Sequence, residues 1–148
     1  MSRGPLRAVT GSAAETEALG AQLAERLLPG DLVVISGEIG AGKTTLVRGA
    51  CRALGVAGPV TSPTFVLGRR YEGSHAEVAH LDLYRLDSLE GEDIALLDDY
   101  LGPGTITFIE WAAAVEPELD GPLTRVTMRH AGGDRREIEI IAPSRRPG

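Results

Sequence analysis

Apolar residues at every fourth position predict the first helix of the chain, over residues 13–28. Its apolar face is formed by Leu19, Leu23 and Leu27. Ser12 and Glu15 have the spacing of a capping box, in which each side chain binds a free backbone donor at the start of a helix. A short strand is expected before this helix, at residues 6–9, and the helix is expected to cover a sheet.

The run Leu32–Ile35 lacks polar alternation, which is typical of a central parallel strand buried on both faces. Helical spacing returns over residues 43–54, and Gly55 is placed to cap the C-terminus of this second helix. Its apolar positions are Val47, Ala50, Cys51 and Leu54. We therefore expect Cys51 to lie in the core, because a catalytic thiol would need an activating base that the sequence does not suggest nearby.

The second half of the chain alternates between extended and helical patterns. In chain order, the predicted elements are two extended runs at 65–71 and 77–84, an acidic helix at 88–101, an apolar strand at 105–111, and a hairpin at 123–130 and 135–141. The hairpin is expected to extend the sheet in antiparallel fashion. A tail rich in Pro and Arg, from about residue 143, is expected to be mobile.

Length and composition then narrow the class of protein. A chain of 148 residues suits a single domain over residues 1–148 with one core. The net charge of −6 argues against strong autonomous binding to nucleic acid or to an anionic membrane, and no apolar run approaches membrane-spanning length. The first residues lead into no signal segment and Cys51 has no disulfide partner, so we expect a cytoplasmic, reducing location.

One motif explains why the strand Leu32–Ile35 and the second helix adjoin. The segment Gly37–Thr44 reads GEIGAGKT, matches GxxxxGK[ST] without a gap, and connects a buried strand to a helix. Its glycines let successive N–H groups face an anion, to which the helix N-terminus adds donors and positive potential. The expected phosphate-binding residues are Glu38, Ile39, Gly40, Ala41, Gly42, Lys43 and Thr44. We therefore predict that the chain binds ATP.

With this loop in place, the pattern of elements predicts an α/β fold of the P-loop NTPase type. We expect a three-layer sandwich, in which a largely parallel central sheet is extended by antiparallel strands and covered by helices on both faces. Lys43 would bring its ammonium group to the terminal phosphates, and the hydroxyl of Thr44 would reach Mg²⁺.

Two carboxylates are candidates for the chemistry on the phosphates. Glu110 ends the apolar strand 105–111, as a Walker B carboxylate does, and is the better candidate for a metal ligand. Asp82 could hold Mg²⁺ through water, orient an attacking water, or be a strand-end turn residue. His80 shares a face with Asp82, but a lone histidine is more often structural than catalytic. Trp111 is placed near the nucleotide, with core packing as the alternative.

Four motifs, in this order and spacing, resemble the TsaE family, which is also called YjeE. They read GEIGAGKTTLVRG, TSPTFVL, HLDLYRL and FIEW, and the resemblance extends from about Thr10 to Ile141. It implies a small, Mg²⁺-dependent P-loop ATPase that works with two protein partners, TsaD and TsaB. These proteins form threonylcarbamoyladenosine in tRNA, with TsaD as the transferase, and this chain would supply nucleotide-driven turnover.

The resemblance also implies roles for individual residues. The phosphate loop of the family falls on Gly37–Thr45, which adds Thr45 to the site. The Mg²⁺ ligands fall on Thr44 and Glu110. The essential aspartate falls on Asp82, so that the predicted catalytic residues are Lys43 and Asp82. Further matches are Ser62–Thr64 as a switch-like loop and Thr10 and Thr16 near the adenine. Judged by residues alone, Thr61, Ser62 and Thr64 could equally sense a phosphate or shape a turn.

Two other functions stay open at this point. A small-molecule kinase of similar fold would need an acceptor pocket and arginines for the transition state, for which Arg69, Arg70 and Arg85 are the plausible suppliers. A nucleotide-gated binding module would need only a partner that distinguishes the ATP form from the ADP form.

Overall fold

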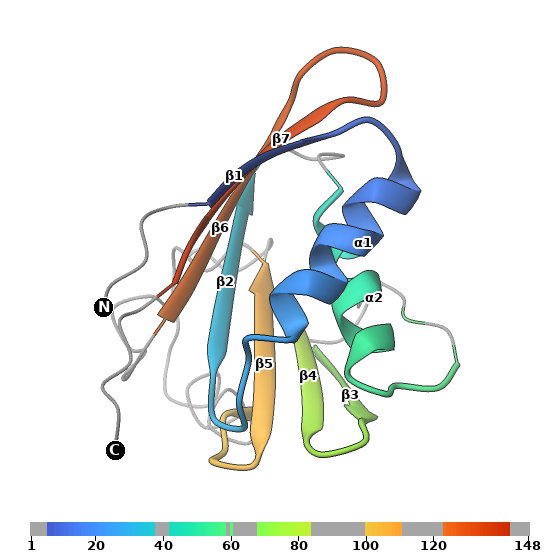
Figure 1. The fold of residues 1–148 in the computed structure, drawn as a ribbon. Helices are drawn as coiled ribbons and strands as arrows, with labels where there is room; N and C mark the ends of the chain where they lie inside the picture. The colour runs from blue at the N-terminus through green and yellow to red at the C-terminus, as the bar shows by residue number, and fades with distance from the viewer. Residues whose placement is uncertain are drawn as a thin grey trace.

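The computed structural model has a seven-stranded sheet and two helices in the part of the chain that it describes (Figure 1). The described residues are 6–37, 42–58, 60, 68–83, 100–110 and 123–142. In chain order, the elements are β1 (Leu6–Thr10), α1 (Ala13–Ala24), β2 (Leu32–Gly37), α2 (Lys43–Ala53), β3 (Gly68–Glu72), β4 (Glu77–Asp82), β5 (Thr105–Glu110), β6 (Leu123–His130) and β7 (Arg136–Ile141). The chain is therefore an α/β protein.

The sheet is mixed, with parallel strands at its centre. The strand order is β1-β7-β6-β2-β5-β4-β3, and the pairs β6/β2, β2/β5 and β5/β4 are parallel. At the two edges, β1, β7 and β3 pair in antiparallel fashion with their neighbours. The predicted parallel centre and antiparallel extensions are confirmed.

The placement of the last hairpin differs from the prediction. Only β7 extends the sheet in antiparallel fashion, because β6 runs parallel to β2. The reason lies in the connection before it. Twelve residues, 111–122, separate β5 from β6, and a connection of this length can return the chain to the opposite end of the sheet, which a tight hairpin cannot.

The helices α1 and α2 lie side by side over one face of the sheet (Figure 1). The leucines of the predicted apolar face, together with Leu46 and Val47 of α2, join Val33 and Ile35 in one buried cluster. Val34, between them in β2, belongs to a second cluster with Leu81 and Ile109. Both faces of β2 are thus buried, as its uniform apolar sequence predicts. The helix predicted at 88–101 lies almost wholly outside the described residues.

The start of α1 follows the sequence signals, whereas its end comes earlier than predicted. The Oγ of Ser12 accepts the N–H of Glu15 at 3.2 Å, and the Glu15 carboxylate accepts the N–H of Gly11 at 2.7 Å. The helix stops at Ala24 because the next residues form tighter turns, and the Asp31 carboxylate captures the N–H of Leu28 at 2.7 Å.

Two glycines allow the helices to approach each other unusually closely. A Cβ placed on Gly20 of α1 would overlap the Leu46 carbonyl of α2, and a Cβ on Gly49 of α2 would overlap the Glu17 carbonyl of α1. Each glycine therefore faces the backbone of the other helix. These backbone atoms cannot move aside as a flexible side chain could. This contact fixes the position of α2 relative to α1. It therefore also fixes where the first residues of α2 lie.

The end of α2 is closed by a Schellman motif, which confirms the predicted cap. Gly55 adopts φ +89°, its N–H reaches the Arg52 carbonyl at 3.1 Å, and the N–H of Val56 reaches the Cys51 carbonyl at 3.0 Å. The N–H of Ser74, in the β3–β4 turn, binds the Leu54 carbonyl at 2.8 Å. The last turn of α2 is therefore joined to the β3–β4 hairpin.

No helix within the described ranges is long and apolar enough to cross a membrane.

We expect Gly49→Ala to destabilise the protein although alanine is the better helix former. The added methyl group must displace the backbone of α1, and overpacking of this kind costs about 1–3 kcal/mol, or more where backbone has to move. Urea unfolding measures the change. Ala18→Gly, at an exposed site on α1, is the control and should cost about 1 kcal/mol through propensity alone. An alanine at position 49 that stabilised the protein would contradict the close contact.

We also expect Cys51 to resist alkylation in the native protein. The side chain is fully buried, as predicted, and burial raises its pKa to about 12. The reactive thiolate is therefore scarce near pH 8, and labelling by iodoacetamide should be at least about a hundredfold slower than in urea. Mass spectrometry against time measures both rates. Equal rates in the two conditions would show that the thiol is accessible in the native state.

Candidate functional site

Parallel pairing brings the C-terminal ends of three strands to one edge of the sheet. Ile35 of β2 is the register partner of Glu110 in β5, and Asp82 of β4 is the partner of Glu110 on the other side. Since side chains alternate between faces, both carboxylates project from the face that α1 and α2 cover. The two candidate carboxylates therefore lie side by side, next to the point where the chain leaves β2 for α2.

Two glycines flank the predicted phosphate-binding segment where the chain approaches other parts of the molecule. A Cβ on Gly37 would meet the Met128 carbonyl of the neighbouring strand β6. Gly42 has φ +94° and precedes the first residue of α2, in a left-handed conformation that an L side chain rarely adopts. The intervening residues, Glu38, Ile39, Gly40 and Ala41, lie outside the described ranges, so their predicted contacts stay predictions.

Lys43 is held in a compact arrangement at the start of α2. Its side chain is only 5% exposed, and Nζ donates a hydrogen bond to the Gly37 carbonyl at 3.1 Å, across the segment between β2 and α2. Burial lowers the pKa of Lys43 from its ordinary value, and the carboxylates of Glu110 and Asp82 oppose that shift. The lysine and both acids thus form one electrostatic group.

Glu110 receives hydrogen bonds from two different elements. The Thr44 hydroxyl, from α2, donates to Oε2 at 3.2 Å, and Nε2 of His80, from β4, lies 2.5 Å from the same oxygen. Glu110 is 3% exposed and His80 is fully buried. The predicted pair Thr44 and Glu110 is therefore brought together, while Thr45 lies beside it, half-buried, in the first turn of α2.

His80 is fully buried, as expected of a structural histidine, and its ring also contacts the carboxylate predicted to bind metal. The available signal was its position two residues before Asp82, which places both on one strand face. The sequence did not reveal that Glu110 belongs to the adjacent strand in a register that puts its carboxylate within reach of the ring.

Thr10 lies at the other side of the same region. Its hydroxyl is 2.7 Å from the hydroxyl of Thr16, and both side chains are buried. The methyl group of Thr16 would lie 4.0 Å from a Cβ on Gly42. The Thr10–Thr16 pair is thus close to the start of α2. Trp111 and the segment containing Thr61, Ser62 and Thr64 fall outside the described residues, so their predicted roles stay predictions.

The oxygen atoms around Glu110 suit a hard divalent cation that is bound partly by the protein and partly by a bound ligand. Thr44 and Glu110 provide oxygen atoms, which Mg²⁺ prefers, and they lie within hydrogen-bond distance of each other. Within the described ranges, no cluster of three or more His, Cys, Asp or Glu side chains could hold a metal by itself. Mg²⁺ commonly binds in this way, through one or two protein groups, phosphate oxygens and water.

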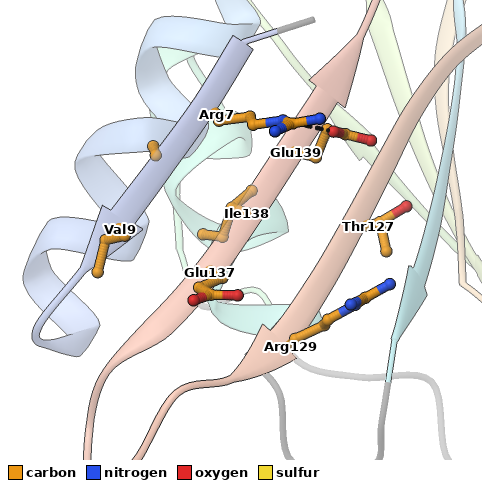
Figure 2. Close-up of a pocket in the computed structure, with 8 residues that line it drawn as sticks. Arg7, Val9, Thr127, Arg129, Glu137, Ile138 and Glu139 are labelled. Atoms are coloured by element: carbon orange, nitrogen blue, oxygen red, sulfur yellow. Dashed lines mark hydrogen bonds and ion pairs between the residues drawn. The ribbon is translucent and has the colours of Figure 1, made fainter.

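A separate hollow of about 530 Å³ lies over β1, β7 and β6 (Figure 2). Figure 2 shows Arg7 and Glu139 paired along one side of it, with Thr127 and Arg129 on β6. The Nε atom of Arg7 lies 2.9 Å from Oε2 of Glu139. Thr127 and Arg129 alternate with the buried Val126 and Met128, so they project from the face opposite the helices. This hollow is therefore distinct from the group around Glu110.

A family model described as threonylcarbamoyl adenosine biosynthesis protein TsaE matches residues 10–138 of this chain. These residues span the sheet from the end of β1 to the middle of β7 and include every side chain discussed around Glu110.

Individual relatives carry the same description. The chain is 35% identical to the tRNA threonylcarbamoyladenosine biosynthesis protein TsaE of Bacillus subtilis, over 89% of this chain and 82% of the relative. It is 44% identical to that of Streptomyces coelicolor, over 78% and 80%. The crystal structure of Bacillus subtilis YdiB superimposes with a TM-score of 0.78 at 31% identity, covering 97% of this chain and 88% of that one. From its sequence and its fold, this chain belongs to the TsaE family.

Proposed function

We propose that this protein is a P-loop ATPase that binds Mg²⁺ and ATP and acts in the formation of threonylcarbamoyladenosine in tRNA. The observation that carries the proposal is the convergence of Lys43, Thr44, Asp82 and Glu110 at the start of α2. A lysine, a hydroxyl and two carboxylates meet there beside a helix N-terminus. This combination of groups suits phosphoryl transfer, because its catalysis consists mainly of positioning and charge stabilisation.

Each group would have a distinct task. The first N–H groups of a helix have no partner within the helix and suit an anion, and Lys43 would leave the Gly37 carbonyl to contact the terminal phosphates. Thr44 and Glu110 would hold Mg²⁺, which, when bound, would neutralise charge on the phosphates. The Thr44 hydroxyl gives its hydrogen to Glu110, so its lone pairs remain for a cation.

Asp82 is the best candidate to act on the attacking water. It is half-buried at the end of β4, adjacent to Glu110 in register and close enough to Lys43 to affect its pKa. A carboxylate in this position can accept a hydrogen bond from water and align it with the terminal phosphate. Water would then be the acceptor of the phosphoryl group, and the products would be ADP and phosphate.

The names of the relatives support the proposed pathway. The proteins from Bacillus subtilis and Streptomyces coelicolor are both described as tRNA threonylcarbamoyladenosine biosynthesis proteins. We propose that this chain drives turnover of a complex of TsaD-type and TsaB-type proteins, and that its own hydrolysis is weak without them. A cytoplasmic location, where tRNA is modified, would follow.

Of the alternatives, the kinase is the weaker, since Arg70 is already engaged elsewhere. Its guanidinium lies 4.6 Å from the centre of the Tyr100 ring and 3.4 Å from the Glu77 carboxylate, on the edge hairpin of the sheet. A metabolite that accepted phosphate rapidly from ATP would nevertheless favour the kinase. The nucleotide-gated module shares the same site and differs only in turnover.

We expect Lys43→Ala and Asp82→Asn each to lower Mg²⁺-dependent ATP hydrolysis by about 10²–10³-fold in the presence of the partner proteins. The first removes charge stabilisation of the transferring phosphoryl group, and the second removes the group that orients water. Phosphate release measures the rate, and thermal unfolding shows whether the variants are folded.

Arg52→Ala is the matched control for the loss of a cation from α2. Arg52 lies in the last turn, 71% exposed, and its partner is Glu17 at 3.5 Å. Its removal should leave hydrolysis within about twofold of the wild type, since exposed pairs of this kind contribute little. Wild-type rates in both Lys43→Ala and Asp82→Asn would rule out the proposed ATPase mechanism.

Depletion of the protein in its native host should lower the amount of threonylcarbamoyladenosine in tRNA. The proposed role is turnover of the modifying complex, so re-expression of the wild type should restore the nucleoside and Lys43→Ala should not. Mass spectrometry of digested tRNA measures it. An unchanged amount after depletion would separate the chain from the pathway while leaving nucleotide binding to be judged on its own.

A further inference from the structure

His80 occupies a place in the core where an apolar residue would ordinarily be expected. Its side chain is fully buried, and its register partner in β5 is Phe108, which is fully buried as well. Within the described structure, Nδ1 has no hydrogen-bond partner. A buried polar atom without a partner costs free energy, so packing alone does not account for a histidine at this position.

Among the described residues, the one polar contact of the ring is with Glu110. A carboxylate oxygen accepts hydrogen bonds, so we assign Nε2 as the donor to Oε2, at 2.5 Å. The contact runs diagonally between strands, since the register partner of Glu110 on β4 is Asp82, two residues beyond His80. His80 thus supports the carboxylate from the interior of the sheet, while Thr44 contacts it from α2.

Both hydrogen bonds end on the same oxygen of Glu110. Oε2 accepts from His80 and from Thr44, which leaves Oε1 without a donor among the described residues. One oxygen is therefore fixed, and the other remains for a cation or for water bound to it. A glutamate that is already held loses less side-chain freedom when it binds a ligand than one that rotates freely.

We propose that His80 is a positioning residue, which fixes the Glu110 carboxylate so that Mg²⁺ bound with nucleotide meets it in a single orientation. This inference rests on the proposed function, because it concerns the carboxylate that would hold the metal. Hydrogen bonds to ligating carboxylates are a common feature of metal sites, and their loss typically lowers metal affinity or activity 10–100-fold.

The test compares His80→Phe with His80→Gln. Phenylalanine preserves a planar ring but has no donor, whereas the amide of glutamine can place an N–H near the position of Nε2. Calorimetry with a non-hydrolysable ATP analogue, with and without Mg²⁺, gives the factor by which Mg²⁺ tightens nucleotide binding. We expect this factor to fall at least tenfold in His80→Phe and to stay within about threefold of the wild type in His80→Gln. Affinity without Mg²⁺ should change little.

The control is Val78→Ala, on the same strand face two residues earlier and fully buried. It should lower the melting temperature through lost packing while keeping the wild-type Mg²⁺ factor. If His80→Phe does not fold, His80→Asn replaces it. The shorter side chain of asparagine cannot reach Glu110, so Mg²⁺ should tighten nucleotide binding less in His80→Asn than in His80→Gln.

An unchanged Mg²⁺ factor in His80→Phe, or in His80→Asn, would overturn the inference, and so would an equal loss in Val78→Ala. Failure of the proposed function gives a different result. In that case the wild type itself would show no effect of Mg²⁺, or Lys43→Ala would bind the analogue as tightly as the wild type.

Discussion

The register of the parallel strands β2, β5 and β4 is the constraint on which the site depends. Glu110 is aligned with Ile35 on one side and with Asp82 on the other. A slip of one residue would turn Glu110 to the opposite face, where it would displace part of the second apolar cluster. Because β5 has buried apolar side chains on both of its faces, the slip would disturb the packing on both faces and is therefore costly. The same packing that stabilises the sheet therefore selects the face on which the carboxylates project.

The second requirement is that α2 begins at a fixed place above those strand ends. The mutual approach at Gly20 and Gly49 sets the distance of α2 from α1, and the apolar face of α2 sets its contact with the sheet. Lys43 and Thr44 are the first residues of this helix, so their position follows from packing farther along it. The placement of the side chains at the helix start therefore depends on packing at the helix centre, although different residues are involved.

Much of this architecture could be predicted from local sequence. The uniform run Leu32–Ile35 indicated a strand buried on both faces, and the Gly–Lys–Thr signature indicated where the helix begins, because these signals depend on neighbours in the chain. The close helix contact and the contact between His80 and Glu110 could not be predicted in this way. Both depend on which segments distant in sequence become neighbours: Gly49 meets Glu17, and His80 meets Glu110. The direction of β6 was missed for the same reason, since hairpin spacing says nothing about the strand on its other side.

The Schellman motif at the end of α2 has a mechanical consequence. The helix is tied to the edge hairpin through the bond from Ser74 to Leu54, and a Cβ on Gly55 would collide with Ser74, so the two elements interlock. A sliding movement of α2 along its axis would break both the hydrogen bond from Ser74 to Leu54 and the contact with α1. The helix is thus held in place at its centre, against α1, and at its C-terminal end, against the β3–β4 hairpin. Any ligand that binds at the start of α2 would then meet a helix whose length and position are already fixed by its packing.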